Sequence, residues 1–114
     1  MEAVTQLEAM ALTYAIEAVV AAALGLMFRR VPLMCVAAAI AGSTVTHPIL
    51  WAVFYDMQAA YGSLATPVLE AAVIAAETLG YRLLATSRWD EAALFSVLAN
   101  AASWWGGELI YALW

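Results

Sequence analysis

Four runs of mostly apolar residues follow one another along the chain, and this succession restricts its fold more than any other feature. The runs cover about residues 9–28, 31–55, 65–85 and 91–114. About 20 consecutive apolar residues are enough for an α-helix to cross the hydrocarbon core of a bilayer. The sequence therefore predicts an all-α fold: an integral membrane four-helix bundle, with residues 1–114 forming a single transmembrane domain.

The composition favours lipid rather than water as the surroundings of these helices. Hydrophobic residues make up 67% of the chain, and charged residues only 11%. An ordinary soluble domain is about 45–50% apolar, and a chain this small has too much surface to cover with so few charges. We therefore expect the lipid bilayer as a partner. We expect no nucleic-acid partner, because the chain has no lysine and no basic patch.

The arginines predict how the helices are oriented. Arg29 and Arg30 lie between the first and second runs, and Arg82 and Arg88 lie at or between the third and fourth. The connection between the second and third runs carries no positive charge. Positively charged connections remain on the cytoplasmic side of a membrane. This pattern places both termini on the outer, non-cytoplasmic side.

Five ionisable residues interrupt the apolar runs: Glu17, His47, Glu70, Glu77 and Glu108. An ionisable group in hydrocarbon costs about 2.5–3.5 kcal/mol on insertion scales, which makes each one a functional candidate. A rise of about 1.5 Å per residue places Glu17 and His47 both about 12 Å from the outer end, and Glu77 near the midplane. We predict that the five form a proton- or ion-binding cluster. In it, Glu77 faces the bundle interior and His47 contacts at least one carboxylate.

Polar and aromatic residues at helical spacing accompany this cluster. They are Tyr14, Trp51, Tyr81, Asn100 and Trp104. Each lies three or four residues from a member of the cluster or from another member of the set, so the pairs share a helix face. A simpler interpretation also stays open, in which the aromatic residues anchor the helices at the membrane interface and Asn100 joins two helices.

The cluster also offers ligands for a divalent cation, and His47, Glu17 and Glu70 are the candidate metal ligands. Carboxylate oxygens and an imidazole suit a hard or borderline metal ion better than a soft one. Pro48 removes a backbone hydrogen bond from its helix and frees a carbonyl one turn earlier. A structural hydrogen bond to His47 is the simpler alternative, and a single axial ligand to a porphyrin is another. No known enzyme motif is present.

Three stretches are distinctive: THPILW at 46–51, LEAAVIAAETLGYRLL at 69–84 and SVLANAASWWGG at 96–107. Together they resemble a group of small bacterial and archaeal polytopic membrane proteins without an established activity. The resemblance implies a location in a bacterial or archaeal inner or cell membrane. It implies no role for any individual residue.

Three functions are compatible with these observations. The favoured one is a small transporter or channel component, a homo-oligomer that binds or passes a proton or a cation through the Glu/His cluster. The second is an accessory structural subunit of a larger membrane complex, in which the acidic residues pair with groups on a partner. The third, a membrane-embedded enzyme acting on a lipid or quinone, is the least favoured because enzyme signatures are missing.

Overall fold

The computed structural model describes residues 6–113, without the side chains of Gln6 and Tyr111, and residues 1–5 and 114 lie outside it. Its elements are α1 (Gln6–Met27), α2 (Pro32–Tyr61), a short 3-10 helix η1 (Gly62–Leu64), α3 (Ala65–Leu84) and α4 (Trp89–Leu113). No strand occurs among the described residues. The all-α class is confirmed, and each helix coincides with one predicted apolar run, up to residue 113 in the fourth.

The second helix is longer than predicted. It was expected to end near residue 55, but it continues through the segment DMQAAY at 56–61. This segment contains no helix-breaking residue, and the first one that follows is Gly62. Gly62 has φ +60° and donates its N–H to the carbonyl of Gln58, which ends the helix. The predicted loop therefore shrinks to η1.

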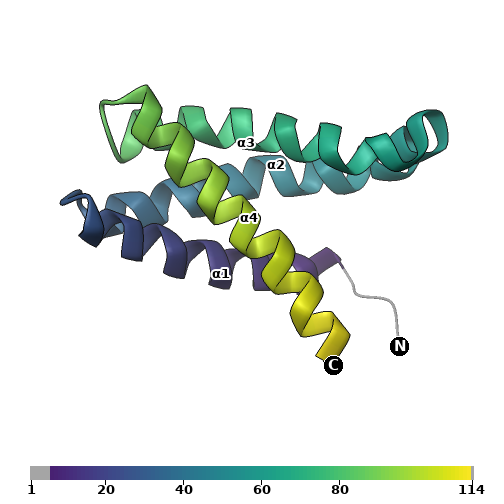
Figure 1. Ribbon diagram of the computed structural model, residues 1–114, viewed down its shortest axis with the longest axis horizontal. Coiled ribbons are helices and arrows are strands. Elements are labelled where there is room, and N and C mark those ends of the chain that lie inside the picture. Colours follow the sequence, from purple (N-terminus) through teal and green to yellow (C-terminus); the bar gives the residue numbers. More distant parts are fainter. Residues whose placement is uncertain (1–5, 114) are drawn as a thin grey trace.

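The helices pack closely at one end of the molecule. Each contacts its neighbour in sequence, and α1 also packs against α4. Figure 1 shows the α1–α2 and α3–α4 turns together at this end. The core here consists mainly of small side chains: Ala21, Leu24, Cys35, Ala38, Ala39, Tyr81, Ala92, Phe95 and Ala99. Small residues let helix backbones approach closely. We call this half the closed end.

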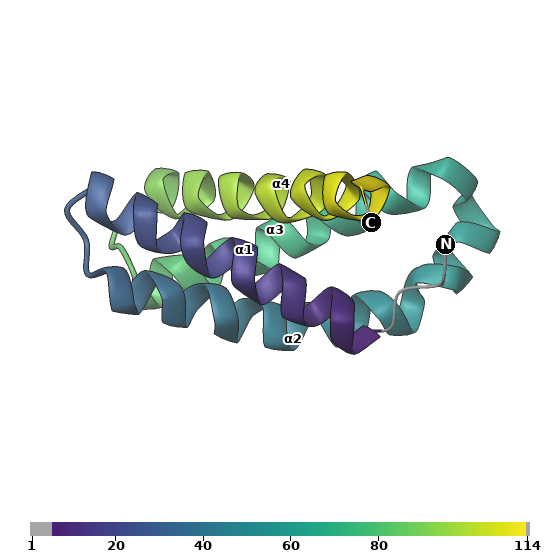
Figure 2. The same ribbon diagram turned by 90° about the horizontal axis from the view of Figure 1, so that it is seen from below.

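At the other end the helix pairs diverge. The α2–α3 hairpin projects beyond the first turn of α1 and the last turn of α4, and α4 crosses α1 at an angle (Figures 1 and 2). We call this half the open end. The candidate site described below lies between the helices in this half.

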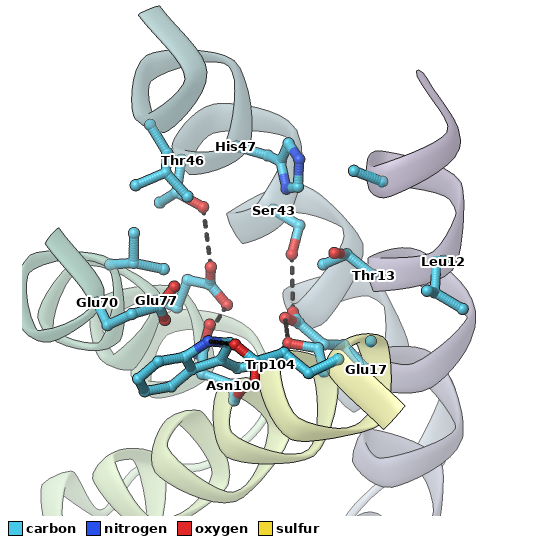
Figure 3. A pocket seen from close by; sticks show the side chains of 16 residues that line it. Leu12, Thr13, Glu17, Ser43, Thr46, His47, Glu70, Glu77, Asn100 and Trp104 are labelled. Carbon is cyan, nitrogen blue, oxygen red and sulfur yellow. Dashed lines mark hydrogen bonds between the residues drawn. The ribbon is translucent and has the colours of Figure 1, made fainter. Parts of the chain in front are cut away.

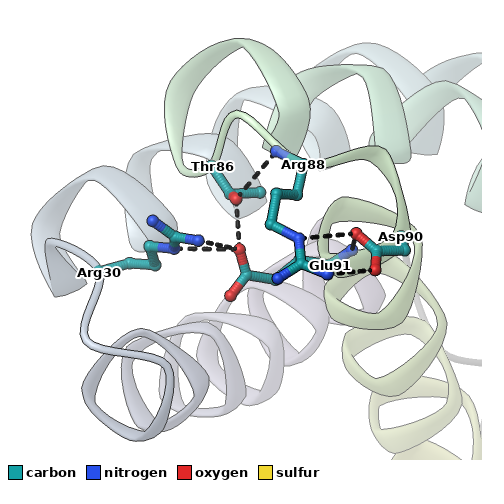
Figure 4. Close-up of polar contacts among 5 residues, drawn as sticks. All are labelled: Arg30, Thr86, Arg88, Asp90 and Glu91. Carbon is teal, nitrogen blue, oxygen red and sulfur yellow. Dashed lines mark hydrogen bonds and ion pairs between the residues drawn. The ribbon is translucent and has the colours of Figure 1, made fainter.

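An ion pair joins the two turns of the closed end (Figure 4). The Arg30 guanidinium lies 2.7 Å from the Glu91 carboxylate, and the Thr86 hydroxyl donates to the same oxygen. We call these three residues the clamp. Beside it, Arg88 forms an exposed pair with Asp90 at 2.7 Å, and its hydrogen bonds lower the pKa of the Asp90 carboxyl.

All four arginines belong to this one end. Arg82 lies 5.4 Å from the centre of the Trp89 ring, at the beginning of α4. Arg29 and Arg30 form the α1–α2 turn, and Arg88 lies in the α3–α4 turn. The prediction that the arginine-bearing connections share one end is therefore confirmed.

The surface of the molecule is apolar and its interior is partly polar. Large hydrophobic side chains are widely exposed, among them Leu7 (79%), Leu33 (74%) and Leu83 (70%). The buried polar residues are Glu17, Ser43, Glu77, Thr86, Glu91, Ser96 and Asn100. Two described stretches are long and apolar enough to cross a membrane: Leu7–Met27, and Pro32–Leu84, which joins α2, η1 and α3. Helix α4, which contains Asn100 and Glu108, is not one of them.

The α1–α2 turn contains a strained residue. Arg29 has φ +59°, a left-handed conformation that side chains other than glycine adopt at a cost. The N–H of Arg30 bonds to the carbonyl of Gly25 at 2.8 Å, and that of Arg29 to Leu26 at 3.3 Å. This pattern is the usual helix end in which glycine is preferred at the position of Arg29.

We expect Arg29→Gly to raise the free energy of unfolding in detergent by about 0.5–1 kcal/mol, because glycine adopts this conformation without steric cost. Thermal denaturation followed by circular dichroism would measure the change. Arg29→Ala is the matched control, since it removes the same charge but keeps the strain. An equal gain in both variants would assign the effect to charge and contradict the backbone explanation.

Candidate functional site

A pocket of about 190 Å³ lies between all four helices in the open half (Figure 3). Its wall includes every member of the predicted cluster: Glu17, His47, Glu70, Glu77 and Glu108. Asn100 and Trp104, predicted as supporting residues, also line it. No arginine belongs to the wall, and the chain contains no lysine. The pocket is therefore strongly acidic.

Two of these carboxyl groups meet in the protein interior. Glu17 of α1 is 2% exposed and Glu77 of α3 is 1% exposed. Their carboxyls are close enough to share a hydrogen bond. We call them the acid pair. The prediction that Glu77 faces the bundle interior is confirmed, whereas its pairing with Glu17 was not anticipated.

Four neutral side chains hold the acid pair from the two remaining helices (Figure 3). Ser43 (2.7 Å) and Ser103 (2.8 Å) donate to the two oxygens of Glu17, and Thr46 (2.8 Å) and Asn100 (3.3 Å) donate to those of Glu77. The ion pairs recorded among residues 6–113 lie at the closed end. Buried carboxylates without a cation suffer both desolvation and mutual repulsion. The arrangement is therefore suited to holding a positive charge, either a proton or a bound cation.

Asn100 is positioned for its role by α4 itself. Its amide also donates to the backbone carbonyl of Ser96 at 2.8 Å, one turn earlier in the helix. The Ser96 hydroxyl in turn donates to the carbonyl of Ile74 at 2.7 Å and so ties α4 to α3. These bonds fix the direction in which the amide points. Asn100 is thus both the interhelical contact of the simpler interpretation and a member of the site.

His47 has a different partner from the one predicted. The hydrogen bond recorded for its Nε2 comes from the indole N–H of Trp51, at 2.8 Å, and the two rings are stacked 6.3 Å apart. No contact between His47 and a carboxylate is recorded among the described residues, so the predicted contact stays a prediction. The four-residue spacing on one helix favours this local pair. An accepting Nε2 requires the neutral imidazole, so His47 contributes a polar but uncharged edge to the pocket.

The candidate metal ligands are not gathered. Within the described part of the chain, no three His, Cys, Asp or Glu residues form a group that could hold a metal ion. His47, Glu17 and Glu70 all line the pocket, but Glu17 is engaged by Glu77 and two serines, and His47 by Trp51. The divalent-cation site predicted from these three residues therefore stays a prediction, whose ligands are not gathered in this structure.

Of the remaining supporting residues, Trp104 lies in the pocket wall, whereas Tyr14 and Tyr81 do not. Trp104 donates its indole N–H to Glu108 at 3.1 Å, and both are exposed at the pocket rim. The Tyr14 hydroxyl pairs with that of Thr44 at 2.6 Å, whereas Tyr81 is completely buried.

Ser103 is one of three donors to the acid pair, with Ser43 and Thr46, that the predicted site set does not include. Its position three residues after Asn100 places both on one face of α4, which is the signal that could have identified it. Serine is common at helix contacts within membranes, so this spacing alone does not distinguish a site from ordinary packing. Its role follows only from its hydrogen bond to Glu17.

The acid pair leaves no space on the side of α2. A Cβ atom added to Gly42 would lie 2.9 Å from the Cγ atom of Glu77, closer than real Cβ contacts come. Because Cγ is near the base of the Glu77 side chain, a rotation of its end would not relieve the clash. Glycine at position 42 therefore allows α2 to approach the acid pair.

We expect Gly42→Ala to destabilise the fold relative to Gly80→Ala by about 1–3 kcal/mol, the usual cost of overpacking. Gly80 is a matched control on the facing helix, because its added Cβ would meet only the Ala38 carbonyl at an ordinary 3.8 Å. Both changes gain similar helix propensity, about 1 kcal/mol, which cancels in the comparison. Equal melting temperatures in detergent would contradict this packing of Gly42 on Glu77.

Comparisons of the chain with protein-family models, curated proteins and solved structures give no match. The function proposed below therefore depends on the geometry of the acid pair and its pocket.

Proposed function

We propose that this chain is a small integral membrane protein that binds a proton or a cation at the acid pair and exchanges one for the other. The observation that carries the proposal is a pair of buried carboxyls, Glu17 and Glu77, whose recorded hydrogen-bond donors are all neutral. In this function the pocket is the path by which the exchanged species reaches the pair. The protein would act as a small transporter or channel component.

The distribution of polar and apolar side chains supports the membrane part of this proposal. Large hydrophobic residues cover the outside, and the acid pair and its donors lie inside. This is the arrangement expected in lipid, where polar groups must find partners within the protein. In water, so much exposed apolar surface would favour aggregation. The two stretches long enough to cross a bilayer agree with the same placement.

The common position of the arginines supports an orientation. Positive charge is retained on the cytoplasmic side, so the closed end, with its four arginines, would face the cytoplasm. The open end and its pocket would then face outward. The beginning of α1 and the end of α4 would lie on the outer side, and α4 would be the fourth span despite its lower hydropathy.

Labelling of single introduced cysteines would test this orientation. The protein would carry Cys35→Ala, and a membrane-impermeant thiol reagent would be added to intact cells. We expect Ser63→Cys, in the exposed η1 segment, to react from outside. Ser87→Cys, exposed in the α3–α4 turn, should react only after the membrane is opened. The reverse pattern would contradict the orientation, and reaction of both from outside would contradict the number of spans.

Exchange follows from the charge balance of the pair. A proton on one carboxyl replaces the repulsion between two anions by a hydrogen bond between them. A cation bound between the carboxylates neutralises them equally well, so proton and cation compete for one place. Cation binding should then release a proton and weaken as the pH falls.

We propose further that the working form is a homo-oligomer. The closed end is filled by packed side chains, and the pocket occupies only the other half of the bundle. A single chain in this conformation therefore provides no continuous path across a membrane. The apolar outer faces of the helices offer a surface on which a second copy could pack.

Proton binding can be tested by replacing both members of the acid pair. In the wild-type protein we expect infrared spectroscopy to detect the carbonyl band of a protonated carboxyl, which disappears at alkaline pH. The double variant Glu17→Gln, Glu77→Gln should lack this band and should keep its thermal stability at alkaline pH. The wild type should lose stability there, because two adjacent buried charges form.

Glu108→Gln is the control, since Glu108 is exposed at the rim. It should leave the titrating band and its pH dependence unchanged. If the band persists in the double variant, the proton is held elsewhere. If the wild type is indifferent to alkaline pH, the acid pair does not bind a proton and the proposal fails.

A further inference from the structure

The chemistry of the pocket wall restricts what can enter it. Four carboxyls line the pocket, and neither an arginine nor a lysine does. Between them lie the aliphatic side chains of Leu12, Leu50 and Val73, and the indole of Trp104. A wall of this kind favours a guest with positive charge at one place and hydrocarbon at another. A strongly hydrated inorganic ion matches only the first of these properties.

A divalent metal ion fits this wall poorly. Mg²⁺ and Ca²⁺ require about six or more oxygen ligands, contributed by several groups or by retained water. Within residues 6–113 no three acidic, histidine or cysteine side chains converge. The two carboxyls that do meet are already held by hydroxyl and amide donors, which a metal would displace. An ammonium group carries its own hydrogen-bond donors and needs fewer partners.

We propose that the pocket binds a small organic primary ammonium ion, with its N–H groups at the acid pair and its hydrocarbon part along the aliphatic wall and Trp104. The ammonium would replace the shared proton, so this inference rests on the proposed function. Hydrogen bonds from a cation to a carboxylate are about twice as strong as those between neutral groups. Contact of the hydrocarbon part with the aliphatic wall and the indole removes apolar surface from water, which also favours binding.

Phenethylammonium is a suitable probe, because it combines one ammonium group with an aromatic hydrocarbon part. Titration calorimetry of the detergent-solubilised protein, in two buffers of different ionisation enthalpy, would measure both affinity and proton release. We expect binding accompanied by the release of about one proton near neutral pH. The neutral analogue 2-phenylethanol should bind at least tenfold more weakly, and Mg²⁺ should not compete.

Three variants separate the parts of the site. Glu77→Gln should weaken phenethylammonium binding at least tenfold, because one of the two carboxylates is lost. Trp104→Leu should weaken it severalfold without changing proton release. Trp89→Leu, at the closed end and outside the pocket wall, should leave the affinity unchanged. Circular dichroism of each variant would establish that the helices remain folded.

Two results would overturn the inference. Equal binding of 2-phenylethanol and phenethylammonium would mean that the pocket recognises hydrocarbon alone. Absence of phenethylammonium binding to a protein whose acid pair still titrates in the infrared would refute the ammonium site while leaving the proton site intact. Loss of the infrared titration itself would instead refute the proposed function, so the two failures are distinguishable.

Discussion

The contact between Glu17 and Glu77 is the constraint on which the open half of this molecule depends. The two carboxyls come from α1 and α3, which are not neighbours in the sequence, and their hydrogen-bond donors come from α2 and α4. All four helices therefore converge on one pair of side chains. Because a buried polar group without partners is costly, the rotation of each helix about its axis is tied to this convergence.

At the closed end, in contrast, a buried carboxylate is paired with a cationic side chain of the protein. Glu91 is 7% exposed and has a full cationic partner in Arg30, supported by Thr86. Removing one member of such a pair would leave an uncompensated charge, which is why a buried ion pair resists change. The acid pair lacks such a partner. The same chain thus contains one acid paired with its own arginine and two that, in the proposed function, hold an exchangeable positive charge.

The sequence predicted well where along each helix the cluster residues lie, because this follows from residue position. Hydropathy located the four helices within a few residues, apart from the end of α2, and the 1.5 Å rise placed the ionisable residues in one half with Glu77 near its border. The five residues of the cluster do line one pocket. In contrast, the pairing of Glu17 with Glu77 depends on how two non-adjacent helices are rotated. Helices that are apolar on most sides carry little information about that rotation.

The differences from expectation at His47 and α2 have local causes. Depth alone suggested a carboxylate partner for His47, but Trp51, four residues away on the same helix, lies within reach without any tertiary contact. The end of α2 was predicted near residue 55 instead of at Tyr61, because the polar residues that follow were taken as a sign of a loop. Asp56 and Gln58 are polar but compatible with a helix, and only Gly62 has a backbone conformation that ends it.

The geometry around Gly42 links the charge of the acid pair to the position of a helix. Glu77 packs so tightly against this glycine that its side chain has no room to move towards α2. In the proposed function, a cation that pushed Glu77 towards α2 would therefore displace α2 or α3. At the closed end the clamp and the small-residue core hold the same helices together. Movement would consequently be confined to the open half, where the hairpin of α2 and α3 projects beyond the other helices (Figure 2). Occupation of the acid pair and the width of the pocket are then coupled by steric contact alone, without a dedicated hinge.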